Sequence, residues 1–384
     1  MRHKVGIPWL SVSGYGLRAT GYRLPTFGFW LLAFACWPLA FGFLSGCPRP
    51  DSAARPDIEM DALHIKTGVD ELGLETYDAQ TLMEKGAEVF NAGKHDKAAR
   101  YFQRVLSEYP QSSRVPAALF NLGLCAETAG DFEKARALYE RVVKEHAGEE
   151  VALDARFRLG ACLSALKRFD EALKVFSALQ ELKELSENDR LEASVNVGVC
   201  LTGLNRLDDA ETELFHAMIA FRKISQKEYI ENNYFMAQGQ FYLGEINRAR
   251  METVKLEFPQ EKLEKDLEQK AQFLLDAQTA YIKAIRIGNL HWAAASGFRI
   301  GGLYEVFHQQ LVTAPVPPDL TEEQTAVYRE ELRKKVSVLL AKAINVYERN
   351  LDMAQRVGLT SKWVDDTNLR LEKLKEQYLR ENLQ

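Results

Sequence analysis

The first half of the chain repeats one pattern of small and apolar positions. Gly86, Gly123, Gly160 and Gly198 are separated by 37, 37 and 38 residues, and a fixed period of this size indicates an array of one structural unit. Twelve residues after each glycine stands an alanine, and sixteen residues after it stands a larger apolar residue: Ala98, Ala135, Ala172 and Ala210, then Phe102, Tyr139, Phe176 and Leu214. Small residues let two helices cross closely, and the larger side chain fills the space beside them. The pattern therefore predicts stacked helical hairpins.

The helical pattern continues after residue 223, but its spacing lengthens. Gly244 opens another unit, whereas the matching small and aromatic positions, Ala277 and Tyr281, come 33 and 37 residues later. This spacing predicts two long helices interrupted near Pro259.

Two further segments near the C-terminus are predicted to be helical. Thr321-Glu322-Glu323-Gln324 is a capping box, which predicts the start of a long helix that runs toward Gly358. A last helix over about residues 361–381 predicts the terminal cap that a repeat array needs.

The repeated positions resemble a tetratricopeptide repeat. Pro110 completes the glycine, alanine, aromatic and proline series in the first unit, and Leu122-Gly123 and Leu159-Gly160 carry the leucine–glycine pair of that family. The resemblance implies an all-α fold, a TPR-type α-solenoid of helical hairpins with elongated C-terminal hairpins and a capping helix.

The N-terminal segment has the parts of an export signal. An apolar run from Phe27 to Leu44 is preceded only by basic charges, and Ser45 and Gly46 lead to Cys47. This segment resembles those of bacterial lipoproteins. The resemblance implies cleavage before Cys47, lipidation of Cys47 and, because Pro48 follows, localisation to the outer membrane on its periplasmic face. The open alternative is an uncleaved transmembrane helix, since the run of 18 residues is long enough to span a bilayer.

These features divide the chain into four parts. We expect a lipoprotein signal peptide over 1–46, a flexible linker over 47–76, four tetratricopeptide units over 77–223, and extended tetratricopeptide-like hairpins with a C-terminal cap over 224–384. The linker composition, rich in Pro, Asp, Ser and Gly, predicts a flexible chain.

Charge and cysteine content narrow the function classes. Without residues 1–46 the chain carries 45 basic and 54 acidic side chains, and this balance argues against nucleic acid as a partner.

Cys125, Cys162 and Cys200 each lie two residues after a repeat glycine. Three cysteines do not describe a disulfide framework, so we expect small, buried packing residues.

No catalytic or metal-binding pattern stands out in the sequence. The histidines lack a metal-ligand spacing, and there is no G-x-S-x-G motif. The segment from Gly86 to Lys94 does not have the spacing of a phosphate-binding loop. We therefore expect a protein that is not an enzyme and that has no cofactor and no metal site.

The family resemblance also implies that the first helices of the hairpins line a groove for a partner. The groove positions are chiefly apolar and read Met83, Phe90, Phe120, Leu124, Phe157 and Val195. Such a track suits an amphipathic helix or an extended apolar peptide. The open alternative is that the linker or the C-terminal hairpins cover these side chains. A second aromatic cluster, Tyr229, Tyr234, Phe235, Phe241 and Tyr242, is expected to pack in the core.

Together these features predict a non-enzymatic protein–protein interaction scaffold. It would be anchored by lipid to the outer membrane, face the periplasm and bind a protein or peptide partner of the cell envelope, in an assembly or motility complex. The alternative is a periplasmic ligand-binding module working with a transporter, which would need an enclosed polar pocket.

Overall fold

Helices joined by short turns make up the structure. The computed structural model describes residues 77–226 and 233–382, and within these two stretches it contains thirteen helices and no strand. They are α1 (Ala79–Asn91), α2 (His95–Glu108), α3 (Val115–Thr128), α4 (Phe132–Glu145), α5 (Val151–Ala165), α6 (Phe169–Gln180), α7 (Glu187–Gly203), α8 (Leu207–Ser225), α9 (Tyr234–Thr253), α10 (Gln260–Arg286), α11 (Leu290–Val312), α12 (Glu322–Arg356) and α13 (Lys362–Asn382). The prediction of an all-α array of helical hairpins is confirmed.

The chain divides into two compact units, and the boundary lies within α3. In the described part of the first unit, residues 77–118, α1 packs against α2 around a buried cluster that includes Leu82, Tyr101 and Val105. The Tyr109 hydroxyl donates a hydrogen bond of 2.6 Å to the Tyr77 carbonyl oxygen. This bond ties the end of α2 to the residue before α1.

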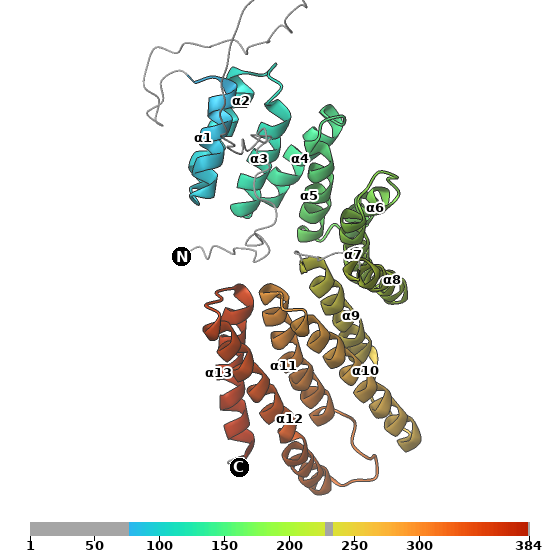
Figure 1. Cartoon of the computed structure of the whole chain (residues 1–384). Coiled ribbons are helices and arrows are strands. Elements are labelled where there is room, and N and C mark those ends of the chain that lie inside the picture. Colours follow the sequence, from blue (N-terminus) through green and yellow to red (C-terminus); the bar gives the residue numbers. More distant parts are fainter. Residues whose placement is uncertain (1–76, 227–232, 383–384) are drawn as a thin grey trace, which may run out of the picture. The chain divides into compact units, whose positions relative to one another are not determined.

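The second unit continues the array from residue 119 to the cap. Helices that follow one another in the chain lie side by side, as the pairs α9–α10 and α11–α12 show (Figure 1). One buried cluster joins α5 to α9 and includes Phe176, Leu214 and Ile246. Two more continue through α9, α10 and α11 and then through α12 and α13. The core of this unit therefore consists of successive apolar clusters between neighbouring helices, as in other repeat arrays.

The repeat glycines meet the larger apolar residue of the second helix in every hairpin. A Cβ atom placed on any of them would collide with that side chain, in the pairs Gly86–Phe102, Gly123–Tyr139, Gly160–Phe176, Gly198–Leu214, Gly244–Tyr281 and Gly301–Tyr347. The predicted close helix crossings are confirmed.

Turns between the paired helices use a left-handed residue at one position. Gly93 and Gly130 have φ of 75° and 79°, and Lys167 and Asn205 have φ of 61° and 58°. Glycine adopts this region without a steric penalty, whereas a lysine does so at a cost.

The C-terminal elements begin where the capping signals predict. Thr321 caps α12, and its side chain and that of Gln324 form the reciprocal capping box. The following helix, α13, packs against α12 through Leu371 and Leu374.

The helices of the described stretches include none that is both long enough and apolar enough to cross a membrane.

Candidate interaction surface

Two of the predicted groove residues lie in the first unit. Met83 and Phe90 are on α1, and both are half-buried. The Phe90 ring meets the His95 ring edge-on, with 4.7 Å between centroids. Both side chains keep part of their apolar surface exposed to solvent.

The other four predicted groove residues lie in the second unit and differ in exposure. Phe120 is half-buried, and its ring lies 5.5 Å from that of Tyr139. Leu124, Phe157 and Val195 are buried, and Val195 has no exposed surface. Phe157 and Val195 belong to one core cluster. Partner binding at the six positions stays a prediction, and within it Phe120 offers a ligand more surface than Val195.

The predicted lipidation site lies outside the described residues. Cys47, the apolar run before it and the linker over 47–76 all fall in the segment before residue 77.

The three repeat cysteines are buried and free of disulfides. Cys162 Sγ lies 3.7 Å from Glu127 Oε1, and Cys200 Sγ lies 3.6 Å from Ser164 Oγ. Burial, followed by the Glu127 charge, raises the pKa of Cys162, and burial raises the pKa of Cys200 to about 11. Both thiols are therefore protonated at neutral pH, as the packing interpretation predicts.

Sequence reasoning missed a polar arrangement that occurs three times. In each case a glutamate on the first helix of a hairpin lies between a tyrosine on the second helix of that hairpin and an arginine on the helix that follows the hairpin. We call these the Tyr–Glu–Arg triads, and they are Tyr139–Glu127–Arg158, Tyr281–Glu245–Arg299 and Tyr347–Glu305–Arg370.

The first triad joins α3, α4 and α5. The Glu127 side chain is completely buried, and its Oε2 lies 3.1 Å from Arg158 Nη1. Burial raises the pKa of Glu127 although the charge of Arg158 opposes this change. Burial and the neighbouring Glu127 charge also raise the pKa of the Tyr139 hydroxyl.

The other two triads lie in the C-terminal part of the array. The Tyr281 hydroxyl donates to Glu245 Oε1, which lies 2.9 Å from Arg299 Nε. The Tyr347 hydroxyl donates to Glu305, and Arg370 Nε donates to Glu305 Oε2 at 2.7 Å. Buried carboxylates require such partners, because an unpaired one is strongly destabilising.

A sequence signal for the triads exists in hindsight. In the hairpins where the larger apolar residue of the repeat is Tyr139 or Tyr281, an arginine stands two residues before the next repeat glycine, namely Arg158 and Arg299. Where it is Phe102, Phe176 or Leu214, no arginine stands there. The hydroxyl is what distinguishes the two kinds of hairpin.

The aromatic cluster of the α9 region is largely part of the core. Tyr234 and Phe241 are buried, and the Phe241 ring lies 4.9 Å from Trp292 and 6.3 Å from Trp363. Tyr229 lies outside the described residues. Burial lowers the pKa of the neighbouring His291 to about 4. The core interpretation is confirmed for the buried members.

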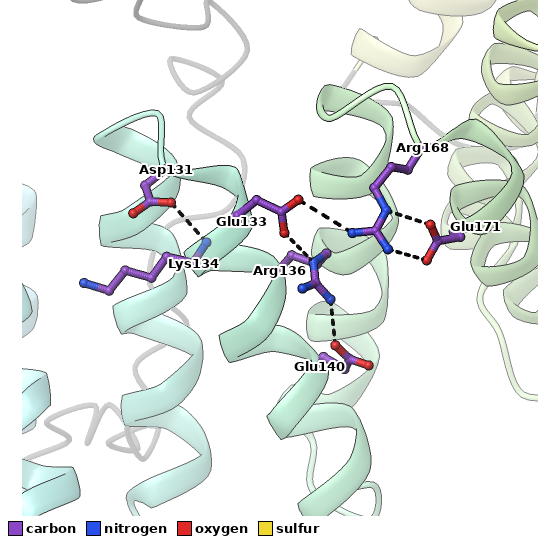
Figure 2. A network of polar contacts seen from close by, with 7 residues as sticks. All are labelled: Asp131, Glu133, Lys134, Arg136, Glu140, Arg168 and Glu171. Carbon is purple, nitrogen blue, oxygen red and sulfur yellow. Dashed lines mark hydrogen bonds and ion pairs between the residues drawn. The ribbon is translucent and has the colours of Figure 1, made fainter.

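A surface network links the turns of two hairpins. Figure 2 shows Arg168 between Glu171, 2.6 Å away, and Glu133 of α4, 3.6 Å away. Arg136 pairs with Glu133 and Glu140 at 2.9 and 2.8 Å. These pairs are partly or largely exposed and add little stability individually.

Comparison with known proteins identifies the repeat. Residues 84–150 and 126–187 match the tetratricopeptide repeat family model. A comparison with curated proteins gave no match.

Several solved structures resemble the chain. The apo form of RapI is 14% identical, with a TM-score of 0.45, over 79% of this chain and 98% of its own. A thermophilic tetratricopeptide protein of Thermus thermophilus is 18% identical, with a TM-score of 0.37, over 57% and 96%. YrrB, a tetratricopeptide protein with an unusual peptide-binding site, is 19% identical, with a TM-score of 0.35, over 53% and 90%. Likenesses of this degree carry over no ligand or activity.

Tetratricopeptide domains bind protein or peptide partners and typically serve as non-enzymatic scaffolds. The family match and the helical hairpins with their close glycine crossings together show that residues 84–187 of the chain consist of tetratricopeptide repeats.

Proposed function

We propose that the protein is a non-enzymatic scaffold of the cell envelope, anchored through lipid on Cys47 to the outer membrane and facing the periplasm. The observation that carries the scaffold proposal is the tetratricopeptide array, because the domains of this family bind proteins or peptides. The export signal that ends at Cys47 supports the anchor and the compartment. The process it serves would be envelope assembly or motility.

The anchor is tested by comparing the wild-type protein with Cys47→Ala in cells labelled with palmitate. The variant should carry no label and should leave the outer-membrane fraction, since the thiol is the only attachment point. Ser45→Ala keeps the thiol and serves as the matched control. Equal labelling of wild type and Cys47→Ala would overturn the lipoprotein proposal.

The scaffold function is tested by affinity capture from solubilised envelopes. The wild-type chain should retain defined proteins that a heat-denatured sample does not retain. Phe120→Ala is the informative groove variant, because Phe120 is partly exposed while Val195 is fully buried. Retention of no protein by the folded wild type would contradict the scaffold proposal.

A further inference from the structure

The C-terminal part of the array presents guanidinium groups above buried carboxylates. In the triads of Glu245 and Glu305, the carboxylate side chains are 10% and 9% exposed, whereas their partners Arg299 and Arg370 are 31% and 54% exposed. A ligand that approaches this surface meets the cations first. We call it the α11–α13 face, and it is formed by Arg299, Gly302, Trp363 and Arg370.

Both arginines contact their buried glutamates through Nε, which leaves the N–H donors of the terminal nitrogens for another ligand. Arg370 contacts Glu305 through Nε, and Arg299 contacts Glu245 through Nε. Within residues 77–226 and 233–382, the structure gives the terminal nitrogens of either guanidinium no hydrogen-bond partner. A guanidinium has five N–H donors in a planar fork that matches a carboxylate. Each arginine can therefore hold its buried glutamate and a second carboxylate.

The two guanidiniums belong to one face. The Arg299 Cζ atom lies 5.4 Å from the centre of the Trp363 ring of α13, and Trp363 precedes Arg370 by seven residues, or two helical turns, on that helix. The positive charges of Arg370 and Arg299 both act on the Tyr347 hydroxyl. Both cations therefore lie within electrostatic reach of the buried Tyr347 hydroxyl.

A side chain fits at Gly302, beside Arg299. Gly302 lies one helical turn after Arg299, and a Cβ atom there would make only an ordinary van der Waals contact with the Tyr347 hydroxyl, at 3.9 Å. The face thus combines two partly exposed cations with a glycine position that accepts a side chain without a collision.

Two other charged side chains on the neighbouring helices are already paired. Asp366 on α13 pairs with Lys362 at 2.6 Å, and Arg248 on α9 pairs with Glu245 and Glu252 at 3.0 and 2.5 Å. Burial raises the pKa of Glu305, although Tyr347 and Arg370 oppose this change.

We propose that the α11–α13 face binds an acidic segment of a protein partner, with Arg299 and Arg370 each receiving one carboxylate. This inference rests on the proposed scaffold function and adds the chemistry of the partner. Neighbouring helices are separated by about 8–10 Å, and alternate side chains of an extended peptide are about 7 Å apart on one side. An extended segment with carboxylates two residues apart fits this spacing.

The test uses a fluorescein-labelled peptide of sequence Ala-Glu-Leu-Glu-Ala and a glutamine version of it. Fluorescence anisotropy with the wild-type protein should show at least tenfold tighter binding of the glutamate peptide, weakening between 50 and 300 mM NaCl. R299Q/R370Q should lose at least tenfold in affinity for that peptide. The matched control R329Q/R333Q removes the same charge from the exposed surface of α12 and should bind like wild type.

A second variant keeps the test valid if the double replacement unfolds. Gly302→Asp replaces no member of the two arginine–glutamate pairs and places a competing carboxylate one helical turn from Arg299, so it should lose at least tenfold in affinity. Gly302→Asn is its neutral control. Equal binding of the two peptides by wild type, or undiminished binding by Gly302→Asp, would overturn the proposal. Binding to phosphatidylglycerol vesicles without binding to the glutamate peptide would also overturn it.

Envelope capture separates this proposal from the scaffold function. If wild type and Gly302→Asp retain the same proteins in equal amounts, the scaffold function stands and the acidic-segment site is wrong. If wild type binds the glutamate peptide but retains no protein, the site stands and the scaffold function is wrong.

Discussion

The ring of Phe176 lies against the backbone of Gly160, so that a Cβ atom on that glycine would stand 2.5 Å from Cζ of the ring. The contact joins the two helices of one hairpin, and equivalent contacts occur in the other hairpins. Distances below 3 Å between carbon atoms cannot be accommodated without movement, and a ring between two packed helices has little freedom to move.

The first prediction concerns this crossing. Gly160→Ala should lower the free energy of unfolding by about 1–3 kcal/mol, the range for overpacked cores. Gly148→Ala is the matched control, because a Cβ atom there meets nothing within 4 Å, and its effect should stay within about 0.5 kcal/mol. Urea unfolding followed by circular dichroism measures both. Equal stability of the two variants would show that the crossing tolerates a side chain.

The second prediction concerns the left-handed turn residue Lys167. Its φ of 61° is unfavourable for a lysine, so Lys167→Gly should raise the free energy of unfolding by about 1 kcal/mol. Asn205→Gly at the equivalent turn should gain less, because asparagine tolerates this conformation. Thermal melts of the two variants give the comparison. A loss of stability in Lys167→Gly would contradict the strain interpretation.

The third prediction concerns the buried thiols. Cys125, Cys162 and Cys200 should react with Ellman's reagent only after unfolding, because they are buried and the pKa values of Cys162 and Cys200 are raised. Thr212→Cys adds a thiol at an exposed position of α8 and should react at once in the native protein. Fast reaction of two or more native thiols in the wild type would be the opposing result.

The fourth prediction concerns pH and Glu127. Burial raises the pKa of Glu127 above its ordinary value of 4.5, so the folded chain holds this proton more tightly than the unfolded chain does. The contribution of Glu127 to stability is therefore full below about pH 4.5 and falls as pH rises through the raised pKa.

Comparison of wild type with Glu127→Gln isolates this effect, because glutamine does not titrate. The free energy of unfolding of wild type minus that of the variant should increase as pH is lowered from 7 to 5. Glu133→Gln, at the surface network, is the control and should not show this increase. A difference that is constant or shrinks on acidification would show that Glu127 is not destabilised by burial.

Much of the fold follows from the sequence alone, because its signals are local or strictly periodic. The 37-residue spacing of Gly86, Gly123 and Gly160 marks where helices cross, since only a residue without a side chain fits there. The box at Thr321 and Gln324 marks the start of α12, since it satisfies backbone groups within one turn.

The tertiary structure decided what lies within reach of a ligand. Val195 and Phe120 both occupy predicted groove positions, yet Val195 is fully buried and Phe120 is partly exposed. Burial depends on which neighbouring helices cover a residue, and periodicity does not encode that cover. The triads also depend on tertiary contacts, because Glu305 contacts Tyr347 and Arg370, which lie 42 and 65 residues further along the chain. The sequence determined the hairpins by local periodicity, whereas packing between distant helices determined the buried charges and the exposed guanidiniums above them.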